Sequence, residues 1–336
     1  MTPKTPLKEL NSNNDEGLEL TLRPSVWEDY IGQDKIKANL KLIMQAARER
    51  SESCDHILFC GQAGLGKTTL AYLIGKEMGV NVRATSGPAL EKAGDVAAIL
   101  SNLEPNEVLF IDEAHRINKM VEEVMYPALE ARKLHLIIGK GPSARTLTLD
   151  LPPFTLIAAT TRTNLISGPL RSRFGAVLRL DYYQLEDIEK IISRSANILK
   201  VKILPEAVNS LARASRFTPR VANRLLKRAR DYAQVYKKDV VDAEVVKNTL
   251  NLLEIDEMGL EEIDRDLLSV IIKRFGGGPV GVRAIAAALN DEPDAIEEVY
   301  EPFLMKLGFL ERTQLGRIAT EAAYRHLGLS PKNTLL

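Results

Sequence analysis

The sequence predicts an α/β domain on a mainly parallel sheet, followed by a small all-helical domain and a domain of three helices and a β-hairpin. Three observations support this order. Short apolar runs alternate with helical periodicity through the first half of the chain, and strand-like runs stop near residue 181. Glycine and proline then separate helical segments from two short strand-like segments near the C-terminus. We therefore place the domains at residues 1–183, 184–256 and 257–336.

The first domain alternates strands with helices after a polar tail, residues 1–17, that we expect to be disordered. Apolar residues recur at helical spacing in three stretches, residues 34–50, 69–78 and 120–131. Strand-like apolar runs occupy three others, residues 56–60, 107–111 and 154–159. This alternation is typical of βαβ units, in which helices connect parallel strands.

Residues 134–151 follow a different pattern, in which leucine and isoleucine occupy every second position on both sides of a glycine-rich stretch. Leu134, Leu136 and Ile138 precede this stretch, and Leu147 and Leu149 follow it. A period of two on both sides of a glycine-rich loop predicts a β-hairpin with a long connection.

The rest of the chain reads as two further domains. Residues 184–256 carry apolar residues only at helical spacing, which predicts a small helical domain. Residues 257–336 contain three helical stretches separated by breaks at 276–279 and 291–293. Two short strand-like stretches, 309–313 and 317–320, then flank a turn at 314–316. Three helices and a hairpin in this order are the pattern of a winged helix-turn-helix.

Composition excludes several classes of protein. The 336 residues include 45 basic and 45 acidic side chains, so the chain is not a globally basic nucleic-acid coat. No apolar run reaches the ~18 residues of a membrane span, and the N-terminus lacks the apolar segment of a secretory signal. Two cysteines, Cys54 and Cys60, are too few for a disulfide framework. We therefore expect a cytoplasmic protein.

The strongest chemical signal is the string GQAGLGKT, residues 61–68, between a predicted strand and a predicted helix. It matches the phosphate-binding loop G-x-x-x-x-G-K-[ST]. Glycines let backbone N–H groups surround phosphate oxygens, and the start of the next helix adds a positive dipole end. Lys67 is expected to reach the β- and γ-phosphates of ATP, and Thr68 to bind Mg²⁺.

Two carboxylates end the strand-like run at 107–111. Asp112 is expected to bind Mg²⁺ together with Thr68, and Glu113 to orient the attacking water. A strand that ends in acids is common by itself, so this assignment depends on the phosphate-binding loop before it. The same residues spell DEAH, but residues 184–336 lack the strand–helix alternation that the second core of a DEAH helicase requires.

Three further side chains suit a nucleotide site. Thr161, at the tip of the strand-like run 154–159, can hydrogen-bond the γ-phosphate or the water. An arginine of the stretch 169–174 suits an arginine finger, which can be supplied to another subunit, and Arg220 could contact the same phosphates from the helical domain. The four histidines show no metal-binding spacing, and we interpret them as structural or surface residues.

Taken together, these motifs resemble those of the AAA+ ATPases, and finer strings resemble the RuvB family of Holliday junction branch-migration motors. The strings are residues 22–24, 30–33, 85–88, 138–145, 151–156, 218–226 and 275–281. The resemblance runs from about residue 20 to residue 329. It implies an α/β AAA+ P-loop core, an all-α lid and a C-terminal winged helix.

The resemblance also implies an activity and partners. A RuvB-like protein is a homohexameric ATPase ring that pumps duplex DNA to migrate Holliday junctions in recombination and repair. It works with RuvA, which holds the junction, and with the resolvase RuvC. Its cofactors are ATP and Mg²⁺.

By resemblance, further residues acquire expected roles. Side chains expected around the adenine and at the closure of the nucleotide site are Leu22, Arg23, Tyr30, Ile31 and Tyr183. Those expected at the phosphates are Gly64, Gly66, Lys67, Thr68, Thr69 and Arg220, and those expected at further nucleotide contacts are Glu130, Ala131, Arg132 and Arg173. The resemblance also makes Arg173 the arginine finger that reaches a neighbouring subunit's nucleotide. Leu147 and Leu149 on the hairpin are expected to dock on RuvA. Arg312 and Arg317 on the wing are expected to contact DNA phosphates.

The sequence departs from the family pattern at several positions. Phe217 stands where glycine is common, Leu315 replaces a basic residue in the wing, and Arg132 replaces an aromatic. Two alternative functions stay open at this point. One is a clamp-loader-like AAA+ protein, and the other is a DNA-binding regulator that a nucleotide switches.

Overall fold

The structure is a computed structural model that describes residues 20–138 and 145–330. Its contacts divide the chain into two compact units, which are described separately below. The boundary along the sequence lies between Tyr183 and Gln184. The predicted tail, residues 1–17, and part of the hairpin loop lie outside the described residues. None of the described helices is both long enough and apolar enough to cross a membrane.

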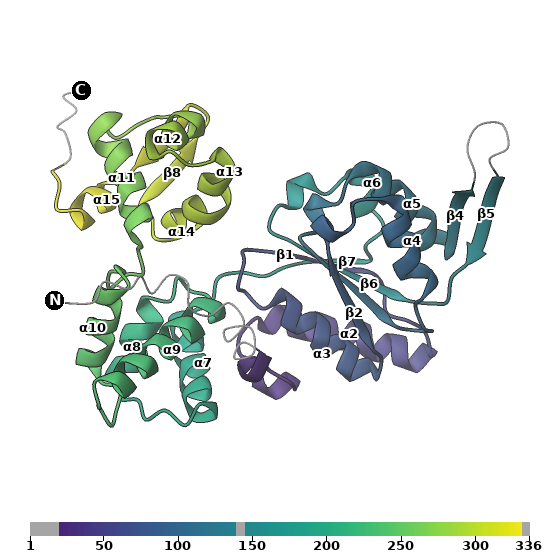
Figure 1. Ribbon diagram of the computed structural model, residues 1–336, viewed down its shortest axis with the longest axis horizontal. Helices are drawn as coiled ribbons and strands as arrows, with labels where there is room; N and C mark the ends of the chain where they lie inside the picture. Colours follow the sequence, from purple (N-terminus) through teal and green to yellow (C-terminus); the bar gives the residue numbers. More distant parts are fainter. Residues whose placement is uncertain (1–19, 139–144, 331–336) are drawn as a thin grey trace, which may run out of the picture. The chain divides into compact units, whose positions relative to one another are not determined.

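The first unit is built on a sheet of five parallel strands in the order β2-β3-β6-β1-β7 (Figure 1). The strands are β1 (Ile57–Cys60), β2 (Val82–Ser86), β3 (Val108–Asp112), β6 (Thr155–Thr160) and β7 (Ala176–Arg179). The predicted parallel sheet is confirmed, and its three central strands lie within one residue of the expected ranges. The outer strands, β2 and β7, were not among the expected strands.

Helices cover both faces of this sheet (Figure 1). They are α2 (Asp34–Arg50), α3 (Lys67–Met78), α4 (Ala93–Ser101), α5 (Lys119–Ala131) and the short α6 (Gly168–Arg171). Leu58, Leu109 and Leu156 point from three neighbouring strands into one buried cluster with α4 and α5. The helix α3 packs on β3 and β6, and α2 packs beside α3. Because successive strand residues alternate between faces, these fully buried strands need apolar residues at nearly every position.

The predicted hairpin is confirmed as β4 (Lys133–Ile138) paired antiparallel with β5 (Arg145–Asp150). It projects from the end of α5 as a separate two-stranded sheet (Figure 1). Leu134 is buried, and Leu136 and Leu149 pack against the core of the unit. Leu147 is exposed.

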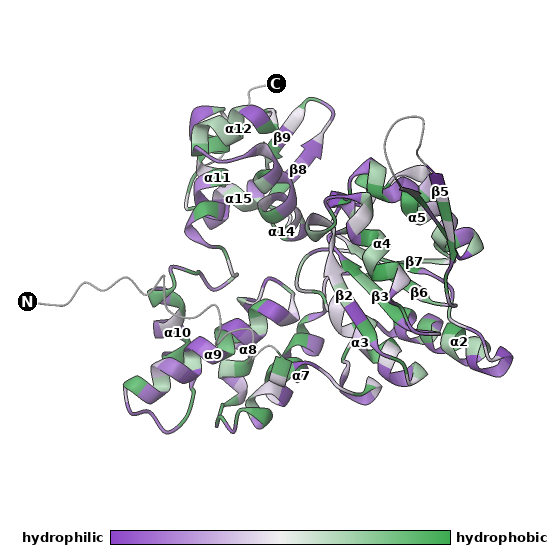
Figure 2. Ribbon diagram, turned by 45° about the vertical axis from the view of Figure 1, so that its right-hand side comes forward, coloured by the Kyte–Doolittle hydropathy of each residue, from purple (hydrophilic) through white to green (hydrophobic). Residues whose placement is uncertain are grey.

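The second unit begins with four helices, as predicted for residues 184–256. They are α7 (Leu185–Ile198), α8 (Pro205–Arg213), α9 (Pro219–Val235) and α10 (Ala243–Leu252). Hydrophilic and hydrophobic residues alternate along them (Figure 2). Ile188, Leu211 and Leu225 are fully buried among these helices, so each helix turns one apolar face to the others.

The predicted winged helix completes this unit. Its helices are α11 (Glu262–Arg274), α12 (Val282–Leu289) and a third helix in three parts: α13 (Pro293–Ala295), a π-helical turn (Ile296–Tyr300) and α14 (Glu301–Lys306). The wing is β8 (Leu310–Thr313) and β9 (Gly316–Ala319), and α15 (Glu321–His326) follows it. Leu267, Ile285 and Phe303 belong to one core cluster. The three helices and the hairpin are confirmed, and α15 is an addition to the prediction.

Candidate nucleotide-binding site

The phosphate-binding loop connects β1 to α3, as predicted. Gly61, Gly64 and Gly66 all have positive φ, at 146°, 79° and 96°. A Cβ at Gly66 would come within 2.8 Å of the Tyr30 hydroxyl, and one at Gly61 within 2.7 Å of the Leu180 carbonyl oxygen. Both the backbone conformation and the close neighbours therefore require glycine at these two positions. The loop delivers the N-terminus of α3 to the site, and the backbone N–H groups at the start of a helix suit the binding of an anion.

Lys67, the first residue of α3, holds its ammonium group inside the loop. Its Nζ donates hydrogen bonds to the carbonyl oxygens of Gly61, at 2.9 Å, and Gln62, at 2.8 Å. The side chain is only 7% exposed. The cation is thus already positioned among the backbone groups that would surround a phosphate.

Thr68 and Asp112 meet from different elements of the fold. The Thr68 hydroxyl, on α3, donates to Asp112 Oδ2, at the end of β3, over 3.5 Å. A hydroxyl and a carboxylate suit Mg²⁺, which keeps several waters and takes its remaining ligands from phosphate oxygens. In the part of the chain that the structure describes, no group of three or more His, Cys, Asp or Glu residues could form a metal site by itself. The two side chains therefore fit a metal ion that arrives with a nucleotide.

Glu113 follows Asp112 in a left-handed conformation, with φ of 49°. Its backbone N–H donates to Asp112 Oδ1 at 2.9 Å, while its half-exposed carboxylate pairs with Arg116 at 3.2 Å. Gly87, just after β2, supports this turn, because a Cβ there would lie 2.3 Å from the Glu113 carbonyl oxygen. Gly87 was not among the predicted site residues, although residues 85–88 form one of the strings on which the family resemblance rests.

The strand β6 ends beside this turn. Thr160, its last residue, is buried, and its Oγ1 lies 3.1 Å from His115 Nδ1 and accepts from the Arg162 N–H at 2.9 Å. The predicted Thr161 is the next residue and is partly buried. The register aligns Thr160 with Cys60, the residue before the phosphate-binding loop. Thr161 thus lies at the same sheet edge as the loop, and His115 links that strand end to the turn after Asp112.

The residues expected around the base lie beside the phosphate-binding loop. The Tyr183 hydroxyl donates to the Leu65 carbonyl oxygen at 3.2 Å, and it lies 3.3 Å from the buried Tyr30 hydroxyl. Burial first, and then the neighbouring Tyr183, raises the pKa of Tyr30 well above its ordinary value. Leu22 is buried, and Ile31, directly after Tyr30, is partly buried.

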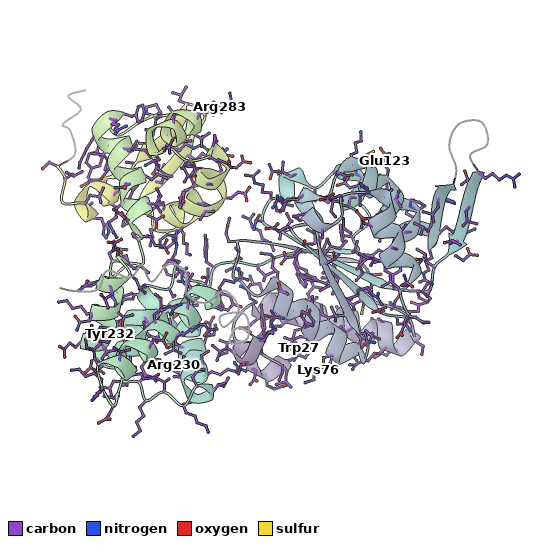
Figure 3. The ribbon with its side chains drawn as sticks, in the orientation of Figure 1. Trp27, Lys76, Glu123, Arg230, Tyr232 and Arg283 are labelled. Carbon is purple, nitrogen blue, oxygen red and sulfur yellow. The ribbon has the colours of Figure 1, made fainter. Side chains whose placement is uncertain are left out.

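The segment before Tyr30 is fixed to α3. The Arg23 guanidinium lies over the ring of Tyr72, 5.1 Å from its centre. Lys76 donates to the Ser25 carbonyl oxygen at 2.8 Å. Trp27, two residues after Ser25, is buried, and Figure 3 labels both Lys76 and Trp27. The same helix that starts at the phosphate-binding loop therefore also positions this segment.

Arg173 lies at the end of the sheet where β1 and β6 begin. It contributes, with Glu130 and Arg132, to a pocket of about 590 Å³ that is also lined by His56 and Phe154. These last two residues precede β1 and β6, whereas the phosphate-binding loop follows β1. A four-residue strand spans about 13 Å, so this pocket and the phosphate-binding loop open at opposite ends of the sheet.

Within that pocket Arg173 is closely held. Its Nη2 lies 2.8 Å from Glu130 Oε1, its Nη1 donates to the Pro169 carbonyl oxygen, and its guanidinium lies 4.4 Å from the Tyr126 ring centre. Ala131, expected beside Glu130, is the exposed last residue of α5. The structure therefore groups Glu130, Arg132 and Arg173 and keeps them away from the P-loop of their own chain.

The remaining predicted residues lie in the second unit or on the hairpin. Arg220 occupies the first turn of α9, after Thr218 at the helix start and Pro219. Arg312 is 54% exposed and pairs with Glu297 at 3.5 Å. Arg317 is buried, and its guanidinium donates to Glu301 and Glu297, each at 2.6 Å. The wing thus presents Arg312 to solvent but holds Arg317 inside.

Comparison with known proteins matches most of the chain to three family models, one after another. Residues 22–180 match the Holliday junction DNA helicase RuvB P-loop domain, residues 183–256 the RuvB AAA lid domain, and residues 257–328 the RuvB C-terminal winged helix domain. The solved Thermotoga maritima RuvB Holliday junction branch migration motor is 47% identical, with a TM-score of 0.85. That match covers 92% of this chain and 99% of the other. An alanine-to-serine mutant of the Thermotoga RuvB, also 47% identical with the same coverage, gives a TM-score of 0.86.

Proposed function

This chain belongs to the RuvB family of P-loop ATPases that drive Holliday junction branch migration, and we propose that it acts as a homohexameric ring with ATP and Mg²⁺. The position of Arg173 is the observation that carries the ring. Its pocket opens at the sheet edge opposite the phosphate-binding loop. An arginine at that edge can complete a nucleotide site only in a neighbouring copy of the chain. The clamp-loader-like and regulator alternatives find no support in the family matches.

In this proposal Lys67 exchanges its two backbone acceptors for β- and γ-phosphate oxygens. Thr68 and Asp112 hold Mg²⁺, which neutralises phosphate charge, and Gly64, Gly66 and Thr69 surround the phosphates. The preformed contacts of Lys67 and of the Thr68–Asp112 pair support these roles, because the side chains are already aimed into the loop. Little rearrangement is then required on binding.

Glu113 orients the attacking water once its carboxylate leaves Arg116. The half-exposed ion pair between them is weak enough for this exchange. Thr161 reads the γ-phosphate from the end of β6, and Arg220 does so from the helical domain. Leu22, Arg23, Tyr30, Ile31 and Tyr183 receive the base. The neighbour's Arg173 stabilises the charge that develops during phosphoryl transfer, with Glu130, Ala131 and Arg132 beside it.

The partners of the proposal are duplex DNA at Holliday junctions, RuvA and RuvC. The exposed Leu147 on the projecting hairpin supports docking of RuvA through an apolar contact, with Leu149 two residues further along the same strand. The half-exposed Arg312 supports phosphate contact by the wing. Arg317 would contact a phosphate only by giving up a buried ion pair. Family membership also supports action in the cytoplasm.

A mixing experiment tests the shared site. Lys67→Ala and Arg173→Ala proteins are each expected to lose ATP hydrolysis and ATP-dependent dissociation of a synthetic four-way junction with RuvA. For Arg173→Ala the loss in turnover is expected to be about a thousandfold, the range known for arginine fingers. Mixed rings restore complete sites, because an intact finger from one protein meets an intact phosphate-binding loop from the other. ATPase activity should therefore reappear in the mixture.

Arg171→Ala is the matched control, since Arg171 is exposed and lies only two residues from Arg173. It should hydrolyse ATP normally. Mixtures that stay inactive although both proteins enter the same rings would show that Arg173 does not act between subunits. A native protein that hydrolyses ATP on DNA but leaves junctions intact would contradict the motor itself.

A further inference from the structure

The turn before α9 is unusual because two consecutive residues with large side chains adopt the left-handed conformation. Arg216 and Phe217 both have φ of 54°. This conformation is unfavourable for residues with a Cβ, and it persists only where the surroundings determine it. The contacts of these two side chains therefore indicate what the turn is built to hold.

Arg216 reaches out of the helical domain into the winged helix. Its Nη2 lies 3.2 Å from Asp264 Oδ1, and its Nη1 lies 3.9 Å from Glu261 Oε1. The guanidinium also covers the ring of Phe303, 4.3 Å from its centre. One cation thus contacts the start of α11 and the middle of α14, two of the three helices of the winged helix.

Asp264 depends on this cation. It has no exposed surface, and burial raises the pKa of its carboxyl group although Arg216 acts in the opposite direction. Its second oxygen accepts from the Glu261 N–H at 2.9 Å, which caps α11. A buried carboxylate that loses its partner cation is strongly unfavourable, so the pair resists separation.

Neighbouring contacts reinforce the same junction. The Phe217 ring lies 6.5 Å from that of Phe303, and Lys306 lies over Phe217 at 5.6 Å. Gly259 approaches Ala214 so closely that a Cβ would lie 2.6 Å from its carbonyl oxygen. These contacts pack the turn between α8 and α9 against α14 and against the segment before α11.

The connecting segment is also fixed. Arg265 donates to the carbonyl oxygens of Leu260, at 2.7 Å, and Glu254, at 2.8 Å. His326 pairs with Asp256 at 2.8 Å. The chain between α10 and α11 therefore adds to the junction and does not act as a flexible linker.

We propose that Arg216 is a positioning residue that locks the helical domain to the winged helix, so that the two domains turn as one rigid body. Arg216 lies in the turn before α9, four residues before Arg220, which occupies the first turn of that helix. A nucleotide-driven movement of α9 is then transmitted directly to the wing. This last step rests on the proposed function, whereas the rigid connection itself does not.

A distance measurement tests the connection without reference to activity. Spin labels at Lys247, exposed on α10, and Ala287, exposed on α12, report the separation of the two domains in the full chain. The native protein should give one narrow distance distribution with ATP and with ADP. Arg216→Ala should broaden it. A broad distribution in the native protein, or an unchanged one in the variant, would overturn the proposal.

A coupling measurement tests the consequence. Arg216→Ala should keep ATPase turnover and the KM for ATP within about twofold, while junction dissociation per ATP falls about tenfold, within the usual range of coupling between sites. A merely destabilised protein would instead lose both activities together. Arg224→Ala is the matched control, because Arg224 is more exposed and, among the described residues, its ion pair is with Glu261 at 3.0 Å and not with the buried Asp264. It should leave both the distance distribution and the coupling unchanged.

A second variant covers the case in which Arg216→Ala does not fold. Arg216→Gln combined with Asp264→Asn leaves no unpaired buried charge, yet it removes the ion pair. It is expected to fold and to broaden the distance distribution. A narrow distribution and native coupling in this variant would exclude Arg216 as the lock. Absence of junction dissociation by the native protein would contradict the proposed function and leave the distance result to decide the rigid connection.

Discussion

At the scale of single residues, Glu297 forms ion pairs with both arginines of the wing, Arg312 and Arg317. Its Oε1 lies 3.5 Å from Arg312 and 2.6 Å from Arg317. Glu297→Gln should free Arg312, whereas Arg317 keeps its buried partner Glu301. We expect duplex DNA to bind a few-fold more tightly. Its affinity should also depend more steeply on salt, by about 0.9 in the log–log slope for one added phosphate contact.

Glu311→Gln is the control for this prediction. Glu311 is exposed on the same hairpin, and among the described residues it forms no ion pair. The two variants change net charge equally, so general electrostatics would affect them equally. Fluorescence anisotropy with a labelled duplex at several salt concentrations separates the two cases. Equal effects would mean that Glu297 does not restrain Arg312.

Residue roles were predictable from sequence where a motif fixes local geometry. The spacing of residues 61–68 predicted the environment of Lys67 because a single loop forms it. The burial of Arg317 was not predictable in this way. Its partners, Glu297 and Glu301, lie on the third helix of the winged helix, and a short strand pattern does not predict how that helix packs on the wing. The link from His115 to Thr160 was missed for the same reason.

At the scale of elements, β5 of the β4–β5 hairpin carries one leucine that can bind a partner, Leu147, and one that packs in the fold, Leu149. Leu147 is 41% exposed, whereas Leu149 packs against the core. Leu147→Asp should therefore weaken binding of RuvA about tenfold or more, as expected for an apolar anchor. Its effect on the free energy of unfolding should stay within about 0.5 kcal/mol. Titration calorimetry and thermal unfolding measure the two effects.

Thr146→Asp, on the neighbouring exposed position of the same strand, is the control and should bind RuvA normally. Leu149→Asp should instead lower stability. Native affinity in Leu147→Asp would remove the hairpin from the interface.

Elements with a strong hydrophobic pattern were predicted, and elements with a mixed pattern were not. The central strands are fully buried and read as apolar runs. The edge strand β2 is only partly buried and contains Arg83, Thr85 and Ser86, so it lacks such a run. The break in the third helix of the wing domain had a usable signal. Pro302 has no N–H to donate to the preceding turn, and the π-helical turn ends just before it.

At the scale of the whole molecule, sequence composition indicated three domains, whereas contacts form two compact units. The second and third predicted domains lie in one unit. The sequence pattern changes at residue 257 from helices alone to helices followed by a hairpin. That change cannot reveal that Arg216 and Asp264, on either side of it, form an ion pair. Domain boundaries read from sequence therefore mark changes in architecture, whereas the compact units depend on contacts between residues that are distant in sequence.

Stability of the first unit should fall in mild acid because of His56. Its Nδ1 accepts from the Leu156 N–H at 2.9 Å, and its Nε2 lies 3.3 Å from the Leu129 carbonyl oxygen and donates to it. The ring thus connects the start of β6 with the end of α5. Burial lowers the pKa of His56, so the folded state holds the ring neutral. Protonation would remove the acceptor at Nδ1.

The sign of the effect follows from proton linkage. Above about pH 6.5, the ordinary pKa of histidine, neither the folded nor the unfolded state binds this proton, and the contribution of His56 is complete. As the pH falls through 6.5, the unfolded state gains the proton first, and the free energy of unfolding decreases until the lower folded pKa is reached.

Trp27, the single tryptophan, is buried in the first unit and reports its unfolding by urea. His56→Asn should be less stable at neutral pH but lose less stability between pH 7.5 and pH 5. Equal pH dependence in His56→Asn and the native protein would assign the loss to other groups.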